Sequence, residues 1–497
     1  MNTDPAIAEL SRLSTGVEAL DGVLGGGFPA LSTTIVSGEP GTGKTILMVQ
    51  ILLHLARQGK KCLYFTTVSE PAIKLIRHMQ RFSFFDPKLL DEAVILGDLG
   101  SVIRTEGFGA ALARVAERCE QTEADVVVID SFKAIHDMVA ESSDSRRLIY
   151  DLAVQLASWG ATTFLVGEYS LADVTSLPEF AIADGIVFLR NELEELTRVR
   201  ELEILKLRGS NYVAGRHFFD ISPSGVLFYP RVTTPAPAAE SSPNDGREGR
   251  VPFGVPGLDD MLGGGLPPAS TTLIEGGTGT GKTLLGLHFL TAGAAHDDVG
   301  LFLTLEESAN QLRNVARNFG LPFRECEQRG LLHVRYASPV ELSPDRFLHE
   351  ARALVEQLGA RRVVLDGLSA LSLGVQSARR FKQLVYALSR HFRELGVTLA
   401  MTMEIPEVLG GQQLTGHGVS SIADNVILLR YLEVQARLER AISILKARTI
   451  AHSTELRTFS ILDDGASVGG PLKELRGVLT GLPVPVSNTL ESIKRDP

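Results

Sequence analysis

Two short stretches of the sequence have the residue types and spacing of a phosphate-binding loop. GEPGTGKT (38–45) and GGTGTGKT (276–283) both fit G-x-x-x-x-G-K-[ST], and each lies between a strand-like and a helical pattern. In such a loop the backbone N–H groups curl round nucleotide phosphates, the lysine reaches the β and γ oxygens, and the threonine can hold Mg²⁺. The sequence therefore predicts two sites for ATP and Mg²⁺. The expected ATP contacts are Gly41, Thr42, Gly43, Lys44 and Thr45 in the first loop, and Thr278, Gly279, Thr280, Gly281, Lys282, Thr283 and Leu284 in the second.

An aspartate follows each loop at the end of an apolar, strand-like stretch. Asp130 ends DVVVID and Asp366 ends RRVVLD, 86 and 84 residues after the two loop lysines. Taken alone, an aspartate at a strand end is more often a turn former or a helix cap. Because both copies pair it with a phosphate loop, we expect Asp130 with Thr45, and Asp366 with Thr283, to hold the magnesium and its water shell.

Further acids distinguish the two copies. In LFLTLEES, Glu306 and Glu307 follow the strand after the second loop's helix, where a carboxylate could order the metal's water or deprotonate a nucleophile that attacks the γ-phosphate. The first copy has LYFTTVSEP, which is interpreted as Ser69 in the place of Glu306, with Glu70 retained as the catalytic candidate. The alternative is that Glu307 and Glu70 begin the next helix, since acids suit its first turn.

The sequence elements that must position these residues occur twice in the chain. TGVEALDGVLGGGFP (15–29) is answered by FGVPGLDDMLGGGLP (253–267), and the two loops keep the same offset of 238 residues. Within each copy, strand-like and helical patterns alternate, which predicts an α/β fold with a mostly parallel sheet covered by helices. We expect domains at 1–232 and 250–485, a linker at 233–249 rich in Pro, Ala and Ser, and a tail at 486–497.

The bulk composition excludes several classes of protein. There are 49 basic and 59 acidic residues, a formal net charge of −10 and one tryptophan, which argues against a nucleic-acid partner. Three well-separated cysteines predict neither a disulfide framework nor a zinc cluster. The start of the chain has no signal-peptide pattern, and no apolar stretch reaches 18 residues. We expect a cytoplasmic protein with no membrane partner.

The motifs together closely resemble the KaiC family of circadian-clock ATPases within the RecA-like superfamily. The resemblance rests on the tandem loops, the LDxxLGGG segments, the strand-end EES, and ILKLRG near the end of the first domain, matched by ILKART in the second. It implies two tandem RecA-like P-loop domains and a double-ring homohexamer with ATP at the subunit interfaces. The residues that it implies as nucleotide contacts are Lys206, Leu207 and Arg208 for the first ring, and Arg440, Lys446, Arg448 and His452 for the second.

The resemblance also implies an autokinase that acts as a clock or timing switch. The family phosphorylates and dephosphorylates two neighbouring hydroxyl residues of its second domain, and Ser420 and Ser421 fall on that pair, with Thr415 as a third hydroxyl nearby. Here the pair is Ser-Ser where the family commonly has Ser-Thr. A KaiB-like partner is compatible with the resemblance, whereas the short tail is unlike the segment that docks KaiA and does not support a KaiA-like partner.

Two alternatives stay open at this stage. The first is a hexameric ATPase that signals by conformation, in which Ser420 and Ser421 only cap a turn, since serine pairs are common capping residues. The second is a DNA-directed motor, because RecA-like domains build those as well and fold alone does not decide function. For Lys206 and Lys446, the alternative to contacting a nucleotide is that they are solvated ends of edge strands.

Overall fold

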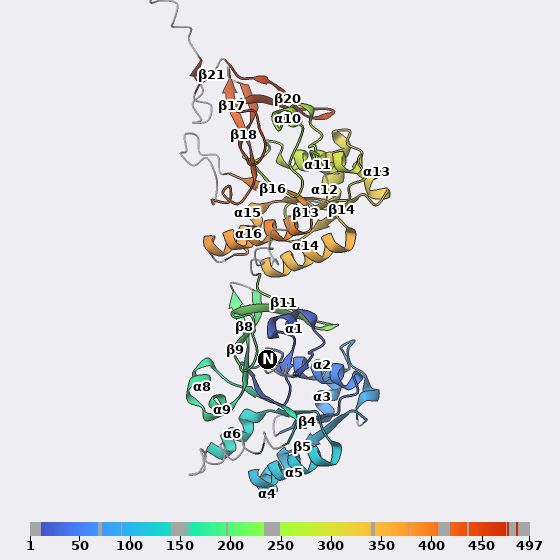
Figure 1. Ribbon diagram of the computed structural model, residues 1–497, viewed down its shortest axis with the longest axis vertical. Coiled ribbons are helices and arrows are strands. Elements are labelled where there is room, and N and C mark those ends of the chain that lie inside the picture. Colours follow the sequence, from blue (N-terminus) through green and yellow to red (C-terminus); the bar gives the residue numbers. More distant parts are fainter. Residues whose placement is uncertain are drawn as a thin grey trace, which may run out of the picture. The chain divides into compact units, whose positions relative to one another are not determined.

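The chain divides into two compact units, Met1–Arg231 and Val232–Pro497, and each unit is described by itself (Figure 1). The structure is a computed structural model that describes residues 11–67, 72–90, 92–140, 155, 159–194, 197–232, 249–338, 343–375, 377–405, 418–434, 437–473, 475–476 and 484–485. Most of the expected linker, 233–248, and the whole expected tail, 486–497, lie outside these residues. No helix in the described ranges is long and apolar enough to span a bilayer.

The first unit is built on a nine-stranded sheet with the order β5-β4-β6-β7-β3-β8-β9-β10-β11. From β5 to β8 the pairing is parallel, and from β8 to β11 it is antiparallel. The strands are β3 (Thr33–Gly38), β4 (Cys62–Thr66), β5 (Val94–Asp98), β6 (Val126–Asp130), β7 (Thr162–Glu168), β8 (Gly185–Glu194), β9 (Thr197–Leu207), β10 (Arg216–Ser222) and β11 (Gly225–Tyr229), and a separate pair joins β1 (Arg12–Leu13) to β2 (Phe28–Pro29).

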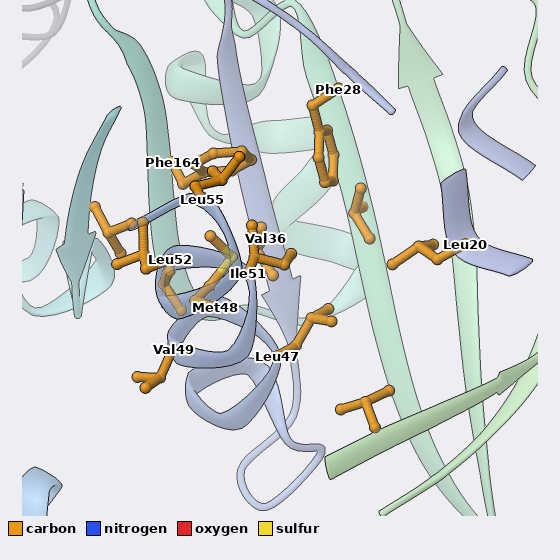
Figure 2. Close-up of a cluster of buried hydrophobic side chains, with 14 of the residues drawn as sticks. Leu20, Phe28, Val36, Leu47, Met48, Val49, Ile51, Leu52, Leu55 and Phe164 are labelled. Carbon is orange, nitrogen blue, oxygen red and sulfur yellow. The ribbon is translucent and has the colours of Figure 1, made fainter. Parts of the chain in front are cut away.

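Helices cover both faces of this sheet, as an apolar parallel sheet requires. The alternation along β6 shows why, since Val126 and Val128 pack in the core of α2 while Val127 and Ile129 pack in the core of α5. Figure 2 shows the α2 side, where side chains of α2 meet Val36 of β3 and Phe164 of β7. The helices are α1 (Glu18–Leu24), α2 (Lys44–Arg57), α3 (Ala72–Met79), η1 (Pro87–Leu89), α4 (Gly100–Glu106), α5 (Phe108–Thr122), α6 (Phe132–Ala140), α8 (Leu171–Ser176) and α9 (Pro178–Ile182).

The second unit repeats this topology, with the sheet order β14-β13-β15-β16-β12-β17-β18-β19-β20. Its strands are β12 (Thr271–Gly276), β13 (Gly300–Thr304), β14 (Leu332–Tyr336), β15 (Arg362–Asp366), β16 (Thr398–Glu404), β17 (Asn425–Val434), β18 (Arg437–Ala447), β19 (Arg457–Leu462) and β20 (Gly465–Pro471), and β21 (Leu475–Arg476) pairs with β22 (Val484–Pro485). Its helices are α10 (Pro256–Met261), α11 (Lys282–Ala294), α12 (Ala309–Asn318), α13 (Phe323–Gln328), α14 (Pro344–Leu358), α15 (Leu368–Leu373) and α16 (Ala378–Glu394). The predicted fold class, two tandem α/β domains with mostly parallel sheets, is confirmed.

The register of the central strands gives each sheet two functionally different edges. In the second unit the pairing of β12 with β17 runs from Thr272, paired with Asn425, to Gly276, paired with Leu429, and the phosphate loop follows β12. We call the edge where the loop lies the P-loop edge, and the edge where β17 begins the opposite edge. In the first unit Gly38 lies at the P-loop edge in the same way, and β8 begins at the opposite edge.

Candidate functional site

The two phosphate loops have the same geometry. In the first, the Lys44 ammonium donates to the carbonyls of Gly38 (3.0 Å) and Glu39 (2.8 Å), and in the second, Lys282 donates to Gly276 (3.0 Å) and Gly277 (2.7 Å). Each loop leads straight into a helix, α2 or α11, whose amino end adds its partial positive charge. Burial lowers the pKa of Lys44, and the nearby carboxylates of Glu168 and Asp130 oppose this effect. Both loops can therefore receive a triphosphate.

Glycine is required at the last position before each loop lysine. Gly43 and Gly281 have φ values of 98° and 107°, which residues with a side chain rarely adopt. A Cβ on Gly43 would lie 2.6 Å from the Ile221 side chain, and one on Gly281 would lie 3.0 Å from Ile461. Other predicted contacts brace the loops, since the hydroxyls of Thr42 and Thr280 each donate to a loop carbonyl and Thr278 donates to Glu404. Leu284 lies in the first turn of α11, where it is buried in the core.

The predicted metal-binding pairs are brought together in both units. Thr45 Oγ1 donates to Asp130 Oδ2 over 2.8 Å, and Thr283 Oγ1 donates to Asp366 Oδ2 over 3.0 Å. A hydroxyl and a carboxylate beside a triphosphate are hard oxygen ligands of the kind that Mg²⁺ prefers, so these residues fit the ion. Burial raises the pKa of Asp366, while hydrogen bonds from Thr402 and Thr283 and the Lys282 charge favour its ionised form.

Two supporting hydroxyls at these sites were missed by sequence reasoning. Tyr64 of β4 donates to Asp130 Oδ2 over 2.6 Å, and Thr402 of β16 donates to Asp366 Oδ1. Both belong to strands next to the aspartate's own strand in space, although they are distant from it in sequence. The available signal was a polar side chain within an otherwise apolar strand.

The acids of the second unit lie directly beyond β13, next to Asp366. Leu305 N donates to Asp366 O (3.0 Å), and the Thr304 hydroxyl accepts from the backbone of Glu306 (3.3 Å) and Glu307 (3.0 Å). Partial burial, then the charges of Asp366 and Glu404, raise the pKa of Glu306, while Lys282 opposes the rise. A carboxyl with a raised pKa near the loop lysine is suited to accept a proton.

The interpretation that Glu307 begins the next helix is wrong. Helix α12 starts at Ala309, and Ser308 caps it in a reciprocal capping box with Gln311. Glu307 therefore lies before the helix cap, where its backbone is held by Thr304. Partial burial and the charges of Asp366 and Glu306 raise the pKa of Glu307.

Strand register revises the comparison with the first unit. Thr66 pairs with Asp130 as Thr304 pairs with Asp366, so counting two residues along the sequence from each threonine aligns Val68 with Glu306. By the same count Ser69 corresponds to Glu307, and Glu70 corresponds to Ser308, the helix cap. The alignment of Ser69 with Glu306 is thus one residue out of register. Val68, Ser69 and Glu70 themselves lie outside the described residues.

The serine pair lies at the opposite edge, immediately before β17. The Ser421 hydroxyl donates to Gly418 O over 3.1 Å, and Ser421 is exposed. Lys446 Nζ donates to the carbonyl of Ser420 over 3.0 Å, and Arg448 Nη2 donates to that of Ser421 over 3.3 Å. Two cations thus hold the backbone that presents the two hydroxyls. The third predicted hydroxyl, Thr415, lies outside the described residues.

The first unit has equivalent cations at its opposite edge but lacks the serine pair that they hold in the second unit. Lys206 Nζ donates to the carbonyls of Phe180 (3.4 Å) and Ala181 (3.2 Å), and Arg208 pairs with Asp184 over 3.4 Å. Leu207, between the two cations, is buried and ends β9. The Asp184 and Asp424 backbones make equivalent bonds to Thr33 and Thr271, so Phe180 and Ala181 correspond to Ser420 and Ser421. Of the two units, only the second therefore has hydroxyl side chains at these two positions.

The strand-end reading of the lysines is also wrong in part. Lys206 lies in β9 and Lys446 in β18, and both strands are paired on each side, so neither is an edge strand. Burial lowers the pKa of both lysines, with the neighbouring arginine of each acting in the same direction. Their ammonium groups are held against backbone carbonyls.

Arg440 lies at the P-loop edge, unlike Lys446 and Arg448. Its Nε donates to Gly279 O over 3.3 Å, and its guanidinium lies 5.3 Å from the centre of the Tyr431 ring. The Tyr431 hydroxyl also donates to Gly279 O, over 2.7 Å, which is a further contact that sequence reasoning missed. His452 lies in the loop between β18 and β19 and is partly buried. Arg440 therefore contacts the phosphate loop of its own unit, and its contact with the nucleotide stays a prediction.

The serine pair and its cations cannot reach the loop of their own unit. Lys446 pairs with Val426, which pairs with Leu273, three residues before Gly276. The serine pair lies further back, before Asn425, which pairs with Thr272, four residues before Gly276. At about 3.3 Å per residue these separations along β12 are about 10 Å and about 13 Å. The phosphate loop and the cation pair of each unit thus lie at different edges of the sheet.

Comparison with known proteins agrees with this architecture. The protein family described as "ATPase: KaiC" matches the chain twice, over residues 13–233 and 251–473. The circadian clock oscillator protein KaiC of Thermostichus vulcanus is 32% identical over 496 residues, covering 98% of this chain and 94% of that protein. The KaiC of Synechococcus elongatus is 30% identical (96% and 93% covered), and the circadian clock protein KaiC3 of Synechocystis sp. is 30% identical (96% and 95% covered). The chain belongs to the KaiC family of ATPases.

Proposed function

We propose that the second unit is an autokinase that transfers the γ-phosphoryl group of ATP to Ser420 and Ser421 of a neighbouring subunit. One observation carries the proposal: the hydroxyl pair and two cations are displayed at the sheet edge opposite the phosphate loop. Within one unit the two halves of the reaction are too far apart, so a head-to-tail ring is the arrangement that joins them. We infer a homohexamer of this kind, as the family resemblance implies.

The residues of the second unit have distinct roles in this reaction. Lys282 and the loop amides hold the β- and γ-phosphates, and Thr283 with Asp366 would hold Mg²⁺, which neutralises phosphate charge when bound. The serine Oγ forms a bond to the γ-phosphorus as the bond from that phosphorus to the oxygen bridging the β- and γ-phosphates breaks, and ADP leaves. The Glu306 carboxylate accepts the serine proton, as its place beside Lys282 and Asp366 suggests.

The neighbour's cations complete the site. Lys446 and Arg448 hold the carbonyls of the serine pair, so docking that pair against a γ-phosphate brings both cations with it. Cations supplied in trans stabilise charge in the transition state and make turnover depend on assembly. The reverse transfer, from phosphoserine to ADP, uses the same contacts and would return the protein to its starting state.

For the first unit we propose ATP binding with slow hydrolysis. Its loop, Thr45 and Asp130 fit ATP and Mg²⁺ as in the second unit, and Lys206 and Arg208 lie at the opposite edge. However, counting along the sequence from Thr66 and Thr304 aligns Val68 and Ser69 with the two acids of the second unit. ATP in this ring would then mainly bridge subunits. The names of the relatives support a role as a clock or timing switch, and a KaiB-like protein is a candidate partner.

The proposal is tested by mapping phosphate on three proteins incubated with Mg-ATP: the wild type, Lys282→Ala and Lys44→Ala. We expect phosphate on Ser420 or Ser421 of the wild type and none on Lys282→Ala. Lys44→Ala is the matched control, because it removes the equivalent lysine of the first loop and leaves the kinase site whole. Its assembled fraction should be phosphorylated. Full modification of Lys282→Ala would overturn the proposal.

A second candidate is an ATPase that signals by conformation alone. It is favoured by one contact, since the Ser421 hydroxyl already donates to Gly418 O and so closes a turn before β17. On this reading the wild type hydrolyses ATP without carrying phosphate at either serine. The same mapping experiment, with ATP consumption measured in parallel, separates the two functions.

A further inference from the structure

The first unit contains a buried polar cluster that the reaction described above does not use. Glu179 of α9 is fully buried, and its Oε1 lies 3.1 Å from His136 Nδ1 of α6 and accepts from the Tyr169 hydroxyl over 3.2 Å. Burial and the Glu179 carboxylate raise the pKa of Tyr169, so that hydroxyl keeps its proton and donates. Among the described residues, neither Glu179 Oε2 nor His136 Nδ1 has a hydrogen-bond partner, so His136 contacts Glu179 without a directed hydrogen bond.

The fold itself does not need this cluster, because the same sheet forms in the second unit without such a cluster at the corresponding described residues. Counting from Asp184 and Asp424 places Val419 at the position of Glu179, and Val419 is fully buried as well. The same kind of count from the ends of β7 and β16 makes Ile405 the counterpart of Tyr169. Counting from the ends of β6 and β15 makes Ser372 the counterpart of His136. A buried carboxylate is costly unless its bonds are complete, whereas a valine at this position is not. The cluster therefore calls for a role that the second unit lacks.

Glu179 adjoins the carbonyls that hold the first unit's lysine. Phe180 and Ala181 follow it directly, and both accept from Lys206 Nζ. The Phe180 ring packs edge-on against the Tyr169 ring, with centroids 5.0 Å apart at 82°. A shift of the Glu179 carboxylate would thus move the two carbonyls that fix the lysine.

The other end of the cluster leads to the unit's own phosphate site. His136 lies on α6, which begins at Phe132, two residues after Asp130, and Asp130 accepts from Thr45 of the loop. The path from Thr45 to Lys206 therefore runs through Asp130, α6, the cluster and α9. It connects the P-loop edge of the first sheet to its opposite edge.

We propose that Glu179 is a positioning residue that fixes Lys206 for the neighbour's nucleotide and, through His136, couples adjacent nucleotide sites of the first ring. This inference rests on the proposed role of Lys206 in trans. It assigns the first unit a coupling element in place of the catalytic acids that it lacks. ATP bound by the loop of one subunit then changes the position of that subunit's Lys206, and with it the affinity of the neighbouring nucleotide site for ATP.

The test measures the ATP concentration at half-maximal assembly by light scattering, with the full chain carrying Lys282→Ala so that assembly reports the first ring. Glu179→Val installs the second unit's residue, and we expect it to raise the midpoint at least about tenfold, the effect of one lost charge-assisted contact, and to lower the Hill coefficient. Glu179→Gln keeps the volume and guards against misfolding of the valine variant. It should give a smaller shift in the same direction.

A double-mutant cycle with Lys206→Ala separates positioning from general stability. If Glu179 acts through Lys206, Glu179→Val has no further effect on the midpoint once Lys206 is gone. Additive effects, or unchanged midpoints for both Glu179 variants beside a shifted midpoint for Lys206→Ala, would overturn the inference and leave the trans role of Lys206 standing. An unchanged midpoint for Lys206→Ala itself would refute the trans role, and the inference with it.

Discussion

Transfer between subunits can be tested by mixing two variants that each lack one half of the reaction. Lys282→Ala removes the phosphate clamp of the second unit and keeps the acceptors. The double variant Ser420→Ala, Ser421→Ala keeps the clamp and removes the acceptors. Neither protein should be phosphorylated alone. Because the clamp and the acceptors lie at opposite edges of one sheet, mixed rings should regain the reaction.

The structure sets the size of the expected effect. A serine oxygen must come within about 3–3.5 Å of the phosphorus to react, whereas the two edges are about 13 Å apart along β12. In rings formed at random from equal amounts, half of the subunits carry acceptors, and about half of those face an intact clamp across the one interface that a head-to-tail ring provides. About a quarter of all subunits should therefore be phosphorylated.

The assay mixes the two proteins without nucleotide, adds Mg-ATP, and measures phosphate on the acceptor-bearing chain by mass spectrometry. Native mass spectrometry checks that mixed rings have formed. The expected result is phosphate on the Lys282→Ala chain only when the other variant is present. Mixed rings without phosphate, beside a phosphorylated wild type, would refute transfer between subunits.

Three further predictions concern single sites. Glu306→Gln should slow phosphoryl transfer by about 10²–10⁴-fold, as expected for loss of a general base, with ATP binding unchanged in a filter assay. In the Lys282→Ala background, Val68→Glu with Ser69→Glu should raise ATP hydrolysis by about 10²-fold, because the pair supplies the acids that the first unit lacks. The pKa of His288 is lowered by burial from its ordinary 6.5, and its Nε2 accepts from Ala466 N. Between that lowered pKa and 6.5, the unfolded chain binds a proton at His288 that the folded unit does not. The free energy of unfolding of the second unit, measured in urea, should therefore fall by up to about 1.4 kcal/mol per pH unit as the pH drops below 6.5. The variant His288→Gln should not show this pH dependence.

Each of these predictions has a contrary outcome. If Glu306→Gln transferred the phosphoryl group at the wild-type rate, a group other than Glu306 would have to accept the serine proton. No rise in hydrolysis with both acids installed would mean that Val68 and Ser69 do not limit the first ring. An equal dependence of unfolding on pH in wild type and His288→Gln would show that this imidazole is not the titrating group.

The fold and the phosphate sites could be predicted because their signals are local. Each loop occupies eight consecutive residues with few permitted substitutions, and strand-like and helical patterns alternate around it. The pairing of Thr45 with Asp130 also followed, since parallel strands bring their carboxyl ends to one edge.

Residue positions that depend on strand register were harder to predict from the sequence. The one-residue error that aligned Ser69 with Glu306 arose because both segments read as strand followed by acid, and only the pairing of Thr66 with Asp130 decides the count. The supports from Tyr64 and Thr402, and the buried Glu179, come from strands and helices that are distant in sequence. Their side chains carry no motif, so packing alone brings them together.

Phosphorylation of Ser420 and Ser421 by ATP held in the second unit can be observed on the purified protein itself. Intact mass and phosphopeptide mapping are measured first in Mg-ATP and then after a chase with ADP. We expect phosphate to appear on one or both serines and to leave during the chase. Continued ATP hydrolysis with no phosphate on either serine would show that the second unit is not an autokinase.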